Sequence, residues 1–557
     1  MGDKSERDKL VSELIELNND NIIDVVNEFN VITNKPDNKY DFFLTRRIFE
    51  KSLPGLNSPV VEVMGCVSHM IKEASSDLTA GILYTPFSKY CEAVASRPAE
   101  VLELTEESPE LWVDFIGPAI ISGANIDLGI YVEKAVQLVS HENIEIRKRA
   151  IFSLGNIKYC NNKIIIEKAI TCLEDSIKKE SDDQLLGNLI KSSFSLYKSD
   201  TSLLTRVIDL IDKSLKTGSD YAIHSASEIF AFNSNVIPVY LLDKLLEGLL
   251  SVNPANKGTI DNIDLGISTL LTHDGYEKGM DLLSSLLLNN SAELSMNSFD
   301  SVIHSILDNH DPLLNRMTTS WLLSGNRALC ESVHSIVENV HGNDIKITVD
   351  KDELTDIDPH HLIFLAHKAI GFLFNNPVTC GSIIISLMHH TNDENVINDL
   401  GALLFDPLLI NYSGELYEYL KSKIESEKGL IKDTINSSIM SLDQYLDSIM
   451  SIPELPELLP SQDQRETSQR RFNRLMAKSL KSAMKDSIIE MITTKSVILY
   501  GASSINHVQG GSKGSNRMVI PMQSHRTSIE MPRQENIDPF GLDYMLRIFR
   551  AEQIQQL

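Results

Sequence analysis

The residues whose types best suit chemistry lie near the end of the chain, in the stretch SVILYGASSINHVQGGSKGSNRMVIP from Ser496 to Pro521. A short apolar run, which could form a strand, leads there into a glycine-rich segment that carries Lys513 and Arg517. Glycine-rich loops after strands often bind phosphate through backbone amides and a lysine. The P-loop pattern GxxxxGK[ST] fails here, because Ser512 stands where the glycine before the lysine is required. We therefore predict a flexible loop, with an anion-binding loop that uses Lys513 and Arg517 as the alternative.

Other catalytic and metal-binding patterns are missing from the sequence. Nine histidines gather between His304 and His390, but no pair is spaced as in the zinc-binding motif HExxH. The dinucleotide motif GxGxxG followed by a helix is absent. No spacing of Asp and Glu singles out a catalytic pair. We expect no catalytic residue, no metal site and no cofactor, and a binding protein is favoured over an enzyme.

A patterned basic surface precedes the glycine-rich segment. The stretch SQRRFNRLMAKSLKSAMKDSIIEMI predicts a helix that begins near Ser468. On a helical wheel its cations form one stripe opposite the apolar face, so we assign them to partner binding. The six residues are Arg470, Arg471, Arg474, Lys478, Lys481 and Lys485.

Several partners for this stripe remain open. It could be a solvated outer face, or it could dock on the acidic body of the same chain or of another copy. An anionic membrane surface and nucleic-acid phosphates are the remaining alternatives. The apolar face is rich in alanine and methionine rather than tryptophan, which disfavours the membrane. A protein partner or self-association is therefore preferred, and nucleic acid is not favoured.

Charge is unevenly distributed along the 557 residues, whose net charge is −26. Residues 465–557 contain 14 Lys and Arg against 8 Asp and Glu, so the rest of the chain is strongly acidic. An acidic body is a poor surface for nucleic acid. Six cysteines without a CxxC pair indicate a reduced, cytoplasmic protein. The polar N-terminus fits no signal peptide, and no apolar run is long enough to predict a transmembrane segment.

Helical periodicity dominates the elements that must position these residues. Two series of amphipathic stretches alternate, and each series recurs every 34 to 40 residues. Such a recurrence predicts an α-solenoid, because a two-helix unit buries its apolar face only against its neighbours. The anchors of the first series are Ala135, Ala169, Val207, Leu245 and Leu282. The anchors of the second series are Ala150, Ile190, Ala226, Leu265 and Val302.

One unit has a sharper pattern than the others. The stretch HENIEIRKRAIFSLGNI resembles the second helix of a HEAT repeat, with Arg147 and Ala150 on the expected faces and Leu154-Gly155 near its end. The resemblance to HEAT-like, armadillo-type repeat proteins is architectural. It implies an all-α solenoid and a function among scaffolds, transport factors and regulators, without selecting one of them.

The chain is expected to divide at changes of composition. A polar stretch with a possible short strand at IKITV interrupts the helices, and a proline-rich stretch precedes the basic helix. The closing stretch ENIDPFGLDYMLRIFRAEQ predicts an aromatic helix that packs on its own domain or binds a partner's groove. The expected parts are an irregular helical cap (1–128), HEAT-like repeats (129–341), a loop insertion (342–359), further helical repeats (360–450), a linker (451–467) and a basic C-terminal module of mixed structure (468–557).

These expectations combine into a scaffold or adaptor. Stacked helix pairs give a long surface that suits extended protein partners better than small substrates. The basic C-terminal tail would mediate assembly or a second contact. The alternative is a regulatory or catalytic subunit whose C-terminal module binds anions or nucleic acid.

Overall fold

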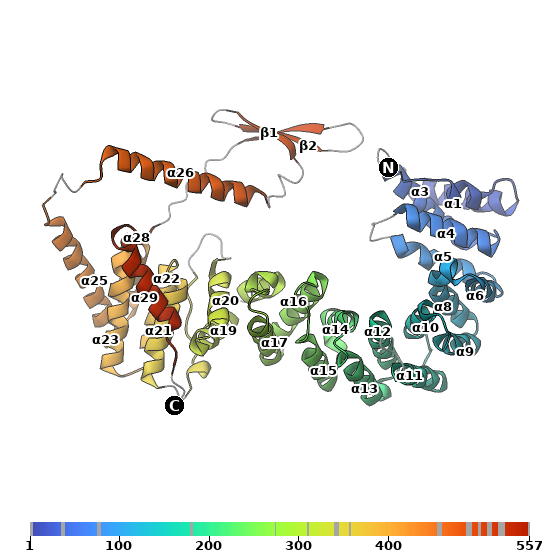
Figure 1. Cartoon of the computed structure of the whole chain (residues 1–557), viewed down its shortest axis with the longest axis horizontal. Coiled ribbons are helices and arrows are strands. Elements are labelled where there is room, and N and C mark those ends of the chain that lie inside the picture. Colours follow the sequence, from blue (N-terminus) through green and yellow to red (C-terminus); the bar gives the residue numbers. More distant parts are fainter. Residues whose placement is uncertain are drawn as a thin grey trace. The chain divides into compact units, whose positions relative to one another are not determined.

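The computed structural model of the chain separates into two units, Met1–Asn339 and Val340–Leu557 (Figure 1). The residues that the structure describes are 4–34, 39–74, 80–178, 182–272, 275–308, 311–338, 345–355, 358–453, 459–485, 493–499, 503–509, 515–521 and 530–554. The fold is an all-α solenoid, followed by a small C-terminal module that contains both helix and strand.

Helices make up all the regular structure described in the N-terminal unit. The first of them are α1 (Lys4–Asn19), α2 (Val25–Asn30), α3 (Lys39–Ser52), α4 (Val60–Ala74), α5 (Tyr84–Glu92), α6 (Arg97–Glu107), α7 (Pro109–Trp112) and α8 (Ile116–Ile126). The next are α9 (Leu128–Val139), α10 (Ile144–Asn156), α11 (Lys163–Ile177), α12 (Asp183–Ser199), α13 (Leu204–Leu215), α14 (Asp220–Phe232), α15 (Val239–Leu249) and α16 (Lys257–Leu271). The last are α17 (Tyr276–Asn289), α18 (Asp300–Asp308), α19 (Asp311–Ser324) and α20 (Arg327–Glu338).

Helices α9 to α18 stack as hairpins in two layers, as predicted from the alternating series. The even layer consists of α10, α12, α14, α16 and α18, and the odd layer consists of α9, α11, α13, α15 and α17 (Figure 1). Successive helices pack more closely in the even layer than in the odd layer. All five anchors of the first series are buried in the odd layer. Repeating helix pairs therefore share one continuous core.

The second series is correct at four anchors and wrong at one. Ala150, Ile190, Ala226 and Val302 are buried, whereas Leu265 is 37% exposed. The neighbouring Gly266 occupies the tight position instead, since a Cβ there would lie 2.3 Å from the Phe230 ring. The physical reason is that the close contact between α14 and α16 requires the smallest residue, which turns Leu265 outward.

Polar residues in the turns fix where the repeat helices begin. Asp127, Asn143, Asn162, Asp182 and Ser219 are the N-caps of α9, α10, α11, α12 and α14. The side chain of each accepts a hydrogen bond from a backbone N–H two or three residues later, at 2.9 to 3.3 Å. Such caps satisfy amides that the helix itself leaves without acceptors, each contributing about 1 kcal/mol.

The C-terminal unit begins with a second set of packed helices. They are α21 (Pro359–Leu373), α22 (Pro377–Met388), α23 (Glu394–Leu403), a π-helical turn η9 (Leu404–Leu409), α24 (Glu415–Ser426) and α25 (Gly429–Met450). Every residue of α22 is buried. A helix that is buried around its whole circumference belongs in the centre of a core, so α22 is the central helix of this unit.

The possible short strand at IKITV does not form. Residues 345–350 belong to no helix or sheet, and they lie along α22 with Ile347 and Val349 buried. The N–H of Ile347 donates to Ser382 Oγ and that of Val349 to Ser386 Oγ, both at 2.9 Å. Hydroxyls one helical turn apart on α22 thus replace the neighbouring strand that this segment lacks.

The basic helix α26 (Gln462–Lys485) begins six residues before the predicted start at Ser468, so it takes up part of the expected linker 451–467. The reason is a capping box. The N–H of Gln464 donates to Ser461 Oγ at 3.3 Å, and the N–H of Ser461 donates to Gln464 Oε1 at 3.1 Å.

The loop predicted from Ser496 to Pro521 is wrong where the structure describes this stretch, which contains a three-stranded antiparallel sheet of β1 (Thr493–Leu499), β2 (Ser503–Gln509) and β3 (Ser515–Pro521). The glycine-rich residues 510–514 lie outside the described residues. Val497 pairs with Ile505, which pairs in turn with Val519. The chain ends with α28 (Arg533–Ile537) and α29 (Pro539–Ala551), which pack on the helices of the C-terminal unit.

Candidate functional site

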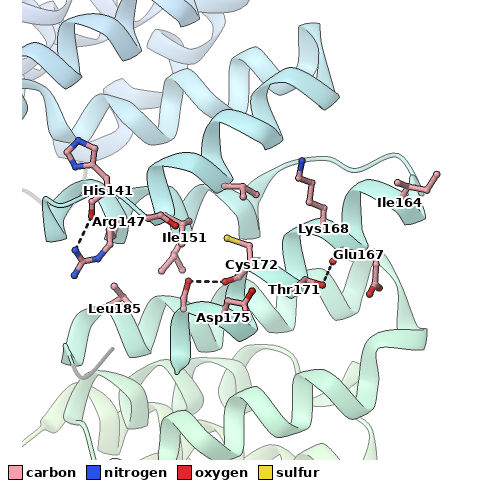
Figure 2. A pocket seen from close by; sticks show the side chains of 14 residues that line it. His141, Arg147, Ile151, Ile164, Glu167, Lys168, Thr171, Cys172, Asp175 and Leu185 are labelled. Atoms are coloured by element: carbon pink, nitrogen blue, oxygen red, sulfur yellow. Dashed lines mark hydrogen bonds between the residues drawn. The ribbon is translucent and has the colours of Figure 1, made fainter. Parts of the chain in front are cut away.

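A cleft of about 650 Å³ opens between α9 and α11 in the odd layer. Its floor is apolar and comes from three helices, with Val139 of α9, Ile151 of α10 and Leu185 of α12 all buried. Figure 2 shows the cleft from His141 and Arg147 at one end to Ile164 and Lys168 at the other. The shape is elongated, and the mouth lies on the surface of the solenoid.

The charged groups around the cleft bond to neighbouring residues. Arg147 Nη1 donates to the carbonyl oxygens of His141 at 3.0 Å and Glu142 at 3.1 Å, which closes the turn before α10. On the opposite wall Lys168 pairs with Glu133, and Lys178 pairs with Asp175 at 2.8 Å. The cleft therefore combines an apolar floor with a rim of hydrogen-bonded and ion-paired groups, which suits a peptide of mixed composition.

Cys172 borders the cleft but is not a nucleophile. Burial, together with the nearby charge of Asp175, raises the pKa of its thiol to about 11. The thiol is therefore protonated at neutral pH, and only a thiolate attacks electrophiles or binds metal readily.

The cleft follows from the unequal spacing of the two layers. In the even layer a Cβ at Gly155 would lie 2.6 Å from Ser192 Cα, so α10 and α12 approach to a distance that only glycine permits. Ser192 Oγ also donates to the Ile151 carbonyl oxygen across this contact, at 2.8 Å. Because one layer is held together so tightly, the opposite layer must spread. A second, smaller cleft of about 230 Å³ lies between α15 and α17.

Ion pairs connect successive helices of the odd layer. We call this set the ion-pair ladder. An acidic residue of each helix pairs with a basic residue of the next helix in the same layer, and the last pair reaches α19. The pairs are Glu133–Lys168, Glu167–Arg206, Asp212–Lys244, Asp243–Lys278 and Glu277–Arg316.

Sequence reasoning missed the ladder although its signal is present in the sequence. An acidic residue directly precedes a basic residue at Glu133-Lys134, Glu167-Lys168, Asp243-Lys244 and Glu277-Lys278. These dipeptides lie in α9, α11, α15 and α17, which are four helices of the odd layer. The spacing of apolar residues predicted the hairpins, but the recurrence of acidic-basic dipeptides was not used.

The predicted partner-binding residues all lie on α26. The side chains of Arg470, Arg471 and Arg474 are exposed, and Arg470 Nη2 pairs with Glu466 at 3.2 Å. Lys478, Lys481 and Lys485 continue the same helix, in the part whose side chains lie outside the described set.

The two predicted anion ligands fall in different places. Arg517 lies in β3, opposite His507 of β2 in the strand register. Lys513 lies outside the described residues. The region is thus a sheet that carries one of the two cations.

In the part of the chain that the structure describes, no group of three or more His, Cys, Asp and Glu side chains is arranged to hold a metal ion. Of the helices described, none combines the length and apolar composition that crossing a bilayer requires.

The last described segment, residues 530–554, forms polar contacts with other helices of the C-terminal unit. Helix α29 packs on α21, and Lys368 of α21 is fully buried beneath its C-terminal end. At the other end of the segment, the Glu530 carboxylate accepts hydrogen bonds from the N–H groups of Gly414 and Glu415, at the start of α24. The aromatic helix thus packs on its own domain, which is the first of the two alternatives drawn from its sequence.

Comparison with known proteins gives a likeness only among solved structures. No family model and no curated protein matches the chain. A solved structure described as a homology model of the full-length AP-3 complex in an intermediate open conformation is similar, with a TM-score of 0.30 and 13% sequence identity. The match covers 79% of this chain and 78% of that one.

Proposed function

We propose that the protein is an intracellular scaffold or adaptor that holds an extended segment of a protein partner on its helical-repeat surface. The observation that carries the proposal is the elongated cleft between α9 and α11, with its buried apolar floor and its rim of paired charges. A peptide laid along it would place apolar side chains on Val139, Ile151 and Leu185. Its own charges would meet the rim.

We further propose that the basic stripe of α26 makes a second contact with an acidic protein surface. Arg470, Arg471 and Arg474 are exposed there. A cluster of exposed positive charges raises the rate of association with acidic partners and makes that association depend on salt concentration. In this proposal the repeats are HEAT-like, the first 128 residues cap them, and the chain acts in the cytoplasm.

The test is affinity purification of the full chain from its native cells, followed by quantitative mass spectrometry. Ile164 is 84% exposed at the mouth of the cleft, so Ile164→Glu should block a partner without harming the fold. Ile22→Glu, at an exposed site remote in sequence and outside the cleft, is the matched control. We expect a partner that is recovered with wild type and with the control but lost with Ile164→Glu. A set of recovered proteins that is the same for all three chains would refute the cleft as a partner site.

The basic stripe has its own test. The triple variant Arg470→Ala, Arg471→Ala and Arg474→Ala should lose a second set of partners. The control is Arg327→Ala, which removes an exposed arginine that pairs within its own helix with Glu331. Recovery of duplex nucleic acid instead, with binding that falls steeply as salt increases, would favour the nucleic-acid alternative.

A further inference from the structure

The C-terminal segment 530–554 lies on α21 and α24 as a bound peptide would. Figure 1 shows α29, in red, against the helices of the C-terminal unit. Its buried side chains are Leu542 and Leu546. Its polar contacts, however, join residues more than a hundred positions apart in the chain, and they gather at the two ends of the segment.

The first end is held by a buried cation. Lys368 is fully buried, and its Nζ donates to the carbonyl oxygens of Arg550 at 2.7 Å and Glu552 at 2.6 Å. Carbonyl groups at the end of a helix lack partners within the helix and carry partial negative charge. A buried ammonium group requires such partners. Lys368 is therefore placed to recognise the C-terminal end of a helix.

Other residues of α21 contact the side chains at the C-terminal end of α29. The ring of His367 stacks on Phe549, with centroids 4.3 Å apart, and its Nδ1 lies 2.7 Å from Glu552 Oε2. A Cβ at Gly371 would lie 3.2 Å from the Arg550 backbone nitrogen, so the absence of a side chain admits the peptide backbone. Arg550 Nε donates to the Gly371 carbonyl oxygen at 2.5 Å. The pattern recognised is Phe-Arg-x-Glu.

The second end is held by a helix N-terminus and a buried amide. Gly414 N–H donates to Glu530 Oε1 at 2.7 Å and Glu415 N–H to Glu530 Oε2 at 3.0 Å. Gly414 is the N-cap of α24 and has no side chain that could accept hydrogen bonds from these amides. The side chain of Asn411 bonds to both the N–H and the side chain of Gln534. A carboxylate from the segment thus completes α24.

We propose that these groups of α21, α24 and Asn411 form a receptor for the segment 530–554, and that a second copy of the chain can supply the segment. All the contacts named above are made by residues of the segment itself. A long stretch of chain, 451–529, joins α25 to it. Tethers of such length give effective concentrations of about millimolar or less. The same contacts are available to the segment of another copy, so two chains would exchange their C-terminal segments. This inference goes beyond the proposed function and does not depend on the cleft.

The first test measures binding of a fluorescent peptide of residues 530–554 to two full-length chains. The variant chain carries Phe549→Ala and Glu552→Ala, which weaken its own segment. We expect the peptide to bind this variant at least about tenfold more tightly than wild type, whose receptor is occupied. Adding Lys368→Met, which keeps an apolar side chain of similar length, should abolish binding. Equal or undetectable binding to both chains, with circular dichroism and melting confirming that the variant is folded, would overturn the receptor.

The second test asks whether whole chains exchange segments. One chain carries Lys368→Met, which disables the receptor, and the other carries Phe549→Ala and Glu552→Ala, which disable the segment. Neither chain alone has a matching pair, but the mixture has one. We expect monomers for each chain alone and a one-to-one complex in the mixture, measured by analytical ultracentrifugation. A mixture that sediments as monomers would overturn exchange between copies.

Discussion

Replacing Gly155 by alanine should destabilise the solenoid, although the same change normally stabilises a helix. The new Cβ would lie 2.6 Å from Ser192 Cα, which is a backbone atom that cannot rotate away. Since ordinary carbon contacts begin near 3.4 Å, α10 and α12 would have to separate by almost 1 Å. Overpacking of this kind costs about 1–3 kcal/mol. Stretching the bond from Ser192 Oγ to the Ile151 carbonyl costs about 1 kcal/mol more. The gain in helix propensity is about 1 kcal/mol, so the net loss should be about 1–3 kcal/mol.

The assay is urea unfolding of the full chain at neutral pH, followed by circular dichroism. The matched control is Gly65→Ala in α4, where a Cβ would meet nothing within 4 Å. This control should gain about 0.5–1 kcal/mol in unfolding free energy, because only helix propensity changes. The two substitutions are chemically identical, so opposite signs would isolate the close helix contact. A Gly155→Ala chain as stable as wild type, or more stable, would refute the argument that this contact sets the spacing of the even layer.

Two further predictions concern the odd layer. Arg206 donates from Nε and Nη2 to Glu174, at 2.7 and 2.6 Å, and from Nη1 to Glu167 at 2.5 Å. Arg206→Met should therefore lower the unfolding free energy, measured in urea, by about 1–2 kcal/mol, and by less in 1 M salt. The hydrogen bond from Arg206 lowers the pKa of Glu174 in the folded chain. The stability that this ion pair contributes is therefore present above the unfolded pKa of about 4.3 and is lost as pH falls through the lowered pKa. Wild type and Arg206→Met should become equally stable in acid, and a difference in unfolding free energy that persists at low pH and high salt would contradict the ion pair. Cys172, whose pKa is raised to about 11, should be about one part in a thousand thiolate at pH 8, against about a quarter for an ordinary thiol. Iodoacetamide followed by peptide mass mapping should therefore modify the exposed Cys160 well before it, and faster labelling of Cys172 would contradict its protonated state.

The hairpin architecture was predictable because burial repeats with the helices. Ala135, Ala169, Val207, Leu245 and Leu282 were aligned by apolar spacing, and all five are buried. In the odd layer each helix faces the core with one stripe, so periodicity and burial coincide.

The even layer shows where that reasoning stops. At Leu265 the apolar anchor was one residue from the position that matters, because the contact with α14 selects the smallest residue rather than the most apolar one. Apolar patterns locate a buried face, but they do not show how closely two helices approach. That information resides in Gly155 and Gly266, which hydrophobic periodicity treats as gaps.

Two local errors had signals in the sequence. Ser461 and Gln464 form a capping box that begins α26, and a serine followed three residues later by glutamine is a known helix start. A five-residue glycine-containing connection joins β2 to β3, and such a connection between short alternating runs indicates a hairpin as well as a linker. The weight given to glycine composition hid the alternation of polar and apolar residues on either side.

The candidate receptor on α21 could not be predicted from the sequence. Lys368 and Glu552 lie in different helical patterns, and nothing in either pattern pairs them. A lysine on an apolar helix normally extends its ammonium group to water along its own stem. The aromatic composition of the C-terminal helix indicated that it binds something, but only the fold identifies the surface.

The ion-pair ladder relates the acidic composition of the chain to its repeat architecture. Glu167 belongs to one hairpin and Arg206 to the next, so their pairing requires both hairpins to be folded and stacked in order. Pairs that are partly exposed contribute only about 0–1 kcal/mol each. Their larger effect is on register, since a hairpin shifted along its neighbour would place like charges together. The acidic residues of the odd layer therefore do more than keep the protein in solution: those in the ladder specify which face of one repeat meets the next.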